Sequence, residues 1–201
     1  MLTIIISFSL FALSQVGTPG PANMVLMSTG ARYGLRKALP FVFGVILGKQ
    51  FIIWPLGFGL IGFVAQVPIL FTTLKILSAI YILWLSYKIA NTRISIKGLP
   101  ENPPGFFSGL IVHPLNPKAW GMIVTGYTSF INSQVSTLSA ILIISFTLMS
   151  MQIILHPLWC WGGQSLASIV RDKVYEKYLM WFLASLTLVS VFYALYQGFK
   201  L

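Results

Sequence analysis

The sequence predicts an all-α integral membrane protein, with six transmembrane helices arranged as two inverted three-helix repeats. Of its 201 residues, 57% are hydrophobic and only 8% are charged, whereas soluble domains contain about 25% charged residues. Six apolar windows reach the length of about 20 residues that a membrane-spanning helix needs. The basic residues fall in alternate loops, which gives these helices a consistent orientation.

The expected helices follow one another along the whole chain, which we treat as a single transporter domain, 1–201. Prolines interrupt the first helix at 18–21 and the fourth at 114–117, because proline removes a backbone donor and clashes with the preceding turn. The first window has no Lys or Arg before its apolar run, so we expect an uncleaved span rather than a signal peptide. The six windows are 2–31, 38–64, 66–87, 106–131, 135–158 and 178–199.

Three further features have structural interpretations. Gly44 and Gly48 have the spacing that lets helices approach closely, so packing is their expected role. The segment 159–178 mixes apolar and charged residues and is expected to form an amphipathic helix at the cytoplasmic interface. Cys160 is the single cysteine, which excludes an intrachain disulfide, and we interpret it as a small apolar filler.

Lysine and arginine side chains are concentrated in three of the connecting loops. Nine of them follow the first, third and fifth spans, whereas the loops after the second and fourth spans contain none. Basic residues mark cytoplasmic loops, so both termini are expected on the non-cytoplasmic side. This bias explains the net charge of +10 without nucleic-acid binding.

A linker-like segment at 89–105 divides the chain into repeat one, about 1–88, and repeat two, about 106–201. Each repeat contains three expected spans. Because three is odd, the second repeat enters the membrane from the opposite side, which gives an inverted repeat. The interrupted helix is the first of each repeat.

The two interruptions are expected to form the substrate site. Both lie roughly 15 Å from the cytoplasmic face of a core about 30 Å thick, so they meet near the midplane. The helix N-termini that follow them attract a carboxylate, and the carbonyl ends that precede them attract a cation. This combination suits an amino acid, with simple kinks as the alternative. The expected substrate-binding residues are Thr18, Pro19, Gly20, Pro21, Asn23, Asn116, Pro117 and Lys118.

Ionisable residues inside the spans are functional candidates, because burying them in lipid is costly. Lys118 is expected to pair with the substrate carboxylate. Lys49 and Lys75 have no acid in any span, and their alternative role is to snorkel or to pack on backbone carbonyls. His113 and His156 are the side chains in the spans that titrate near neutral pH, with local hydrogen bonding as the alternative. The expected proton or path residues are Gln15, Lys49, Lys75, His113 and His156. We expect no catalytic residue, metal site or cofactor.

Several motifs resemble those of the LysE/RhtB family of amino-acid exporters. They are 18–23 (TPGPAN) with 30–36 (GARYGLR), 74–85 (LKILSAIYILWL) and 115–120 (LNPKAW), the last in the form of the cysteine/O-acetylserine exporter-like branch. The resemblance implies a six-span exporter in the bacterial inner membrane that is driven by the proton motive force. Many members carry Asp after Pro-Gly-Pro where this chain has Ala22, which favours a neutral substrate.

We therefore expect a secondary transporter that exports small neutral amino acids or derivatives, similar to cysteine, O-acetylserine or homoserine. Its expected partners are the amino-acid substrate and the lipid bilayer, with a homodimer left open and nucleic acid excluded. Three alternatives remain from the sequence. They are an exporter of metal or other ions on the same scaffold, an intramembrane enzyme, and a membrane assembly subunit without transport.

Overall fold

The computed structural model describes residues 1–60, 103–131 and 134–169, together with the single positions 80, 87, 175, 177, 178, 181, 182, 185 and 189. Within these ranges all regular structure is helical. The expected third and sixth spans lie outside the described residues apart from isolated positions, as do Lys75 and most of the linker. The arrangement as six spans in two inverted repeats therefore stays a prediction.

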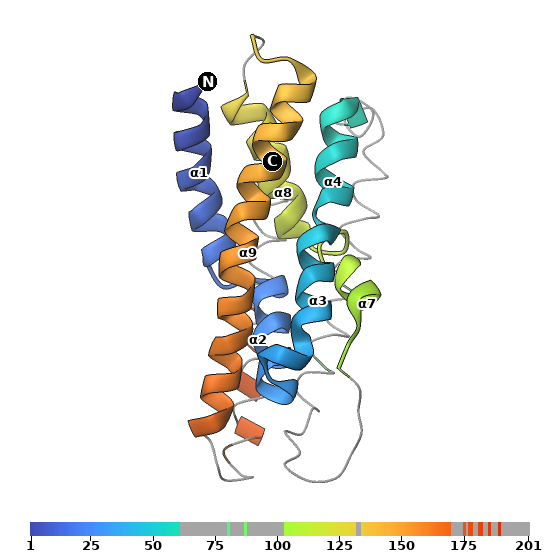
Figure 1. Ribbon diagram of the computed structural model, residues 1–201, viewed down its shortest axis with the longest axis vertical. Coiled ribbons are helices and arrows are strands. Elements are labelled where there is room, and N and C mark those ends of the chain that lie inside the picture. Colours follow the sequence, from blue (N-terminus) through green and yellow to red (C-terminus); the bar gives the residue numbers. More distant parts are fainter. Residues whose placement is uncertain are drawn as a thin grey trace.

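The described helices form an elongated bundle in which most elements occupy only half of its height (Figure 1). In Figure 1, α1, α4 and α8 lie in the upper half, α2, α3 and α7 lie in the lower half, and α9 runs through both. The elements are α1 (Leu2–Gly17), α2 (Pro21–Tyr33), α3 (Leu35–Gly48), α4 (Gln50–Pro55), η1 (Leu56–Leu60), α7 (Phe106–Leu110), α8 (Pro117–Thr125), η2 (Gly126–Phe130) and α9 (Thr137–Ile169).

Three of the expected spans appear as helices of sufficient length and apolarity to cross a membrane. Leu35–Gly59 provides 25 residues and Thr137–Ile169 provides 33. Leu2–Gly17 and Pro21–Tyr33 are together long enough, but they are bent by 50° at the break between them. The predicted interruption of the first span is therefore confirmed. The fourth expected span is also interrupted, by a turn over 111–115 that separates α7 from α8.

The fifth span is longer than predicted. We expected it to end at 158 and to be followed by a separate amphipathic helix over 159–178, but α9 continues without interruption to Ile169. Pro157 lies inside the helix. Transmembrane helices tolerate proline where neighbouring helices compensate for the lost hydrogen bond, and α2 packs closely beside the following turns of α9 through Gly30 and Gly163.

Glycines allow the helices to pack with their backbones in contact. A Cβ on Gly30 would overlap the carbonyl oxygen of Cys160 in α9, and one on Gly163 would overlap that of Met27 in α2. Gly44 and Gly48 are used in the same way, because added Cβ atoms would overlap backbone oxygens of Phe106 and Leu110, at the two ends of α7. The predicted packing role of the Gly44 and Gly48 pair is thus confirmed.

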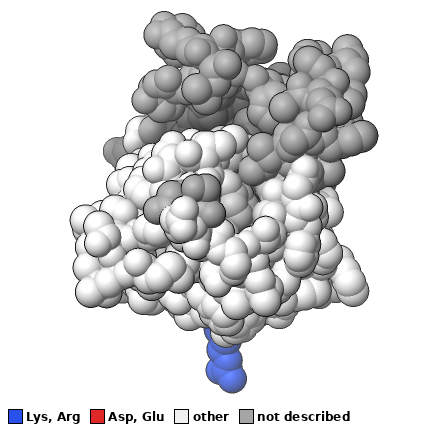
Figure 2. Space-filling model, turned by 90° about the horizontal axis from the view of Figure 1, so that it is seen from above, with Lys and Arg blue, Asp and Glu red and all other residues white. Residues whose placement is uncertain are grey.

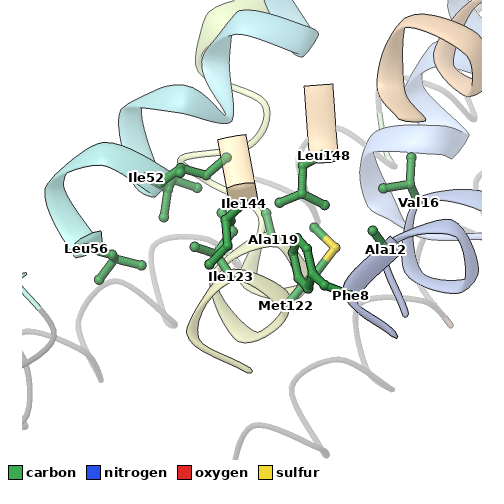
Figure 3. Close-up of a cluster of buried hydrophobic side chains, with 11 residues drawn as sticks. Phe8, Ala12, Val16, Ile52, Leu56, Ala119, Met122, Ile123, Ile144 and Leu148 are labelled. Atoms are coloured by element: carbon green, nitrogen blue, oxygen red, sulfur yellow. The ribbon is translucent and has the colours of Figure 1, made fainter. Parts of the chain in front are cut away.

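A buried apolar cluster, which we call the upper core, joins the elements of the upper half (Figure 3). Its side chains come from α1, α4, η1, α8 and α9 and converge between these elements in Figure 3. It therefore separates the middle of the bundle from the end that carries the N-terminus. The members are Phe8, Ala12, Val16, Ile52, Ile53, Leu56, Ala119, Met122, Ile123, Ile144 and Leu148.

The two ends of the described bundle differ in charge. Figure 2 views the molecule from the end that carries the N-terminus; basic side chains show only as a projection at one edge of the picture, and the other described atoms in this view are neither basic nor acidic. Arg32, Arg36 and Lys37 lie at the opposite end, where α2 passes into α3. The side of the membrane that the lower end faces stays a prediction from these basic residues.

Candidate functional site

Two helical segments are broken at mid-height, and each break carries polar residues. Thr18–Gly20 separates α1 from α2, and 111–116 separates α7 from α8, whereas the backbone stays helical at Lys49 between α3 and α4. Non-helical backbone at this depth of a membrane is tolerated only where it is buried in protein or lines a water-filled cavity. The coincidence of the two breaks therefore marks the middle of the bundle as the candidate site.

Side chains satisfy the carbonyls at the end of α1. Asn23 Nδ2 donates to the carbonyl oxygens of Val16 and Thr18, at 2.8 Å each. The Thr18 hydroxyl donates to the carbonyl oxygen of Gln15 at 3.3 Å. Asn23 is buried, whereas Thr18 and Pro19 are exposed. Asn23 therefore binds the backbone on the buried side of the first break, whereas Thr18 and Pro19 remain exposed.

The N-terminus of α2 has no side-chain cap. Gly20 is the N-cap, Pro21 occupies the first helical position, and the first backbone bond of the helix runs from Met24 N to Gly20 O. The amides of Ala22 and Asn23 precede this bond, so they belong to the first-turn donors that a helix cannot satisfy itself. This end of α2 is suited to an anion.

The N-terminus of α8 is capped, in contrast to that of α2. Asn116 Oδ1 accepts from Lys118 N at 3.1 Å, and Asn116 O accepts from Ala119 N at 2.9 Å. Pro117 at the first helical position has no N–H to offer. We expected both helix N-termini to offer amides to a carboxylate. This is wrong for α8, because oxygens of Asn116 already accept from its first-turn amides.

Lys118 reaches from the second break to the first. Its Nζ lies 2.9 Å from Thr18 Oγ1, and 3.4 Å from both Thr18 O and Pro19 O. The aliphatic chain passes over Gly20, where an added Cβ would lie 3.0 Å from Lys118 Cδ and 3.1 Å from Nζ. The two breaks are thus joined by one ammonium group, which lies beside the uncapped end of α2.

Lys49 is a second lysine at this depth. Its side chain is only 1% exposed, so it does not snorkel to the surface as one interpretation of the sequence allowed. The acids of the chain are Glu101, Asp172 and Glu176, all outside the described residues and outside every expected span. Lys49 and Lys118 therefore share a region that has no carboxylate on the described helices.

Both histidines are buried, and they lie together. Their rings are stacked with centroids 5.6 Å apart and planes at 27°. His113 Nε2 lies 3.0 Å from Gln152 Nε2 of α9, so its partner is 39 residues away and the local-bond interpretation is wrong for His113. The sequence analysis missed Gln152; its position one turn before His156 on an apolar helix was the available signal.

These residues line one pocket. Its volume of about 20 Å³ is room for one or two water molecules. The lining residues are Gln15, Val16, Gly20, Ala22, Asn23, Lys49, His113, Asn116, Lys118, Ala119, Met122 and His156.

The structure thus brings most of the sequence-predicted site residues to one place. Gln15, Gly20, Asn23, Lys49, His113, Asn116, Lys118 and His156 line the pocket. Thr18, Pro19, Pro21 and Pro117 shape the two breaks without lining the pocket themselves.

Comparison with known proteins identifies the family. The model of the LysE type translocators matches residues 13–198. The chain belongs to this family. Curated relatives include the cysteine/O-acetylserine efflux proteins of Escherichia coli (strain K12) and Shigella sonnei (strain Ss046), each 28% identical over 172 residues, which cover 85% of this chain and 87% of the relative. No solved structure matches.

The family match confirms the resemblance carried by the sequence motifs. In this LysE type translocator, the matched range contains both helix breaks and every residue that lines the pocket. The site described above therefore lies within the part of the chain that defines the family.

Proposed function

We propose that this translocator exports small neutral amino acids or derivatives, of the type of cysteine, O-acetylserine and homoserine, across the bacterial inner membrane. The observation that carries the proposal is the bridge from Lys118 to Thr18 and Pro19. It brings together a cation, an uncapped helix N-terminus and the carbonyl oxygens of Thr18 and Pro19 beside the pocket, which are groups suited to the two ends of an amino acid.

When the substrate binds, Lys118 exchanges its contacts with Thr18 and Pro19 for a contact with the substrate carboxylate. The substrate carboxylate binds between the first-turn amides of α2 and Lys118 Nζ, where both the helix dipole and the ammonium attract it. As Lys118 turns toward the carboxylate, the oxygens of Thr18 and Pro19 become available to the substrate ammonium. Asn23 and Asn116 hold the two breaks in shape and complete the amine side of the site with their amide oxygens.

Transport proceeds by alternating access of the two proposed repeats around this midplane site. Six spans with both termini on the non-cytoplasmic side are supported by the basic residues that follow α2 and by the scarcity of charge on the described atoms of the opposite end (Figure 2). Coupling to the proton motive force is assigned to the stacked pair of His113 and His156, because an imidazole nitrogen can accept a proton and later donate it. The relatives are named as efflux proteins for cysteine and O-acetylserine, which supports this substrate class.

Counterflow in proteoliposomes tests the proposal. Vesicles containing the purified protein are loaded with unlabelled O-acetylserine and diluted into the labelled compound. We expect transient accumulation of label that is absent from protein-free vesicles and is inhibited by external cysteine. A protein that exchanges neither O-acetylserine nor cysteine would contradict the proposed substrate class.

The charge of the pocket is predicted to set substrate selection. Ala22→Asp introduces a carboxylate that lines the pocket and competes with the substrate for Lys118 and for the α2 amides. We expect O-acetylserine counterflow to fall by about tenfold, the effect of losing one charge-assisted hydrogen bond, and labelled lysine to gain counterflow. Ala22→Asn is the control of equal size; it should keep most O-acetylserine exchange and gain none for lysine. Equal effects of both variants would exclude the electrostatic explanation.

A further inference from the structure

A buried lysine and two buried histidines meet at the pocket. Lys49, His113 and His156 all line it, and none of the three is more than 3% exposed. A Cβ on Gly48 would overlap the carbonyl oxygen of Leu110, so the end of α3 beside Lys49 lies against the turn that carries His113. Lys49 interacts electrostatically with both imidazole rings, which stack on each other with centroids 5.6 Å apart. We call these three residues the buried basic cluster.

The helices supply no acid to balance this cluster. The described helices contain no Asp or Glu, and neither do the six expected spans. Burying an ammonium group without a partner of opposite charge is costly. Lys118 lines the same pocket and adds a second positive charge. The electrostatics of the pocket therefore favour a bound anion and oppose a metal cation.

His113 adds an unused hydrogen-bond donor. Gln152 Nε2, which can only donate, lies 3.0 Å from His113 Nε2. With the amide in this orientation His113 Nε2 is the acceptor, so the neutral ring carries its proton on Nδ1. His113 Nδ1 is buried without a hydrogen-bond partner, as is His156 Nδ1. A buried donor that is left unpaired is costly, and an anion beside the ring would accept from it.

We propose that the buried basic cluster is a binding site for a small monovalent inorganic anion of the chloride type. The pocket has room for one or two water molecules, and a chloride ion is only slightly larger than water. Lys49 supplies the opposite charge, and His113 Nδ1 donates a hydrogen bond. This site goes beyond the proposed function, which assigns no contact to Lys49.

The anion also accounts for the number of cations at the pocket. A neutral amino acid brings one carboxylate, and Lys118 beside the uncapped end of α2 is sufficient to bind it. Without an anion, Lys49 would place a second, unbalanced charge next to the substrate. With the anion bound, the two lysines have separate partners, which are the substrate carboxylate for Lys118 and the inorganic anion for Lys49.

Thermal unfolding of the purified full chain in detergent tests the site without any amino acid present. Tm is measured in sodium gluconate, whose anion is far larger than chloride, and during stepwise replacement by sodium chloride at constant ionic strength. A ligand at ten times its Kd raises Tm by about 3–6 °C for a chain of this size. We expect a saturable rise of this size with chloride, and a similar one with bromide.

Variants assign the effect to the cluster. Lys49→Met should abolish the chloride-dependent rise, and in gluconate it should melt no lower than the unmodified protein, because an apolar side chain replaces an unbalanced buried charge. Lys177→Met removes an exposed lysine outside the pocket and is the matched control, which should keep the full rise. His113→Phe keeps an aromatic ring beside His156 but removes the donor. It should need about tenfold more chloride for half of the rise, the effect of one hydrogen bond to a charged group.

Three outcomes would overturn the inference. A Tm that does not depend on chloride would mean that Lys49 is buried as a neutral amine. Equal rises in the unmodified protein and in Lys49→Met would indicate a general salt effect. A rise with sodium aspartate that chloride does not produce would assign Lys49 to a second substrate carboxylate.

Two further points keep the test decisive. Should Lys49→Met not fold, the chloride dependence of His113→Phe decides. Because no amino acid is present with chloride or bromide, these melts do not depend on the proposed function. Loss of O-acetylserine counterflow would contradict that function and leave the anion site standing.

Discussion

Replacement of Lys118 by methionine should lower O-acetylserine counterflow by about 100-fold, because hydrogen bonds to a charged group contribute about 1.5–3 kcal/mol and each 1.4 kcal/mol is a factor of ten. Methionine keeps an unbranched apolar chain above Gly20 but removes the ammonium that contacts Thr18 and Pro19. In the proposed mechanism this ammonium also receives the substrate carboxylate. Initial rates of counterflow at several concentrations of O-acetylserine measure the effect.

Lys177→Met is the matched control, since Lys177 is exposed and outside the pocket. It should leave counterflow at the level of the unmodified protein. Lys118→Arg restores a charge, but the larger planar guanidinium does not replace a compact ammonium at such a site. We expect it to recover only a minor part of the activity. Lys118→Met with counterflow within twofold of the unmodified protein would remove Lys118 from the site.

The sequence alone was sufficient to place the two proline breaks and to match their depth. Proline acts on its own turn of helix, so Pro19, Pro21, Pro114 and Pro117 report local structure directly. The depth of each break in the membrane was predicted by counting residues from the cytoplasmic end of its helix. The contact between Lys118 and Thr18 shows that the two breaks do meet. The packing of Gly44 and Gly48 was predictable for the same reason, because a small residue allows close helix approach at its own position.

The remaining features depend on contacts between distant segments. Gln152 is a single amide within an apolar helix, and only its partner His113, 39 residues earlier, gives it a role. The full burial of Lys49 likewise depends on the helices packed around it, and a lysine within an apolar span does not reveal this. The continuation of α9 past Pro157 depends on its packing against α2, which residues 135–158 alone do not reveal.

Gly163→Ala is expected to destabilise the protein strongly, because its Cβ would overlap the backbone oxygen of Met27. Backbone atoms cannot turn away as a side chain can, so α2 and α9 would have to separate. Overpacking usually costs about 1–3 kcal/mol, which corresponds to a fall of about 2–12 °C in Tm for a chain of this size. Cys160 is the single cysteine and is buried. A thiol-reactive fluorogenic dye therefore reports unfolding in detergent through this one residue.

Gly162 is the control, since an added Cβ there has nothing within 4 Å. Gly162→Ala should keep or raise Tm slightly, because alanine is favoured over glycine by about 1 kcal/mol within a helix. Equal melting of the two variants would show that the α2–α9 contact is not tight at this point. A lower Tm for Gly163→Ala should be accompanied by slower counterflow, because α2 carries the uncapped N-terminus at the pocket and α9 carries His156. The contact through Gly163 holds these two sides of the site at a fixed separation.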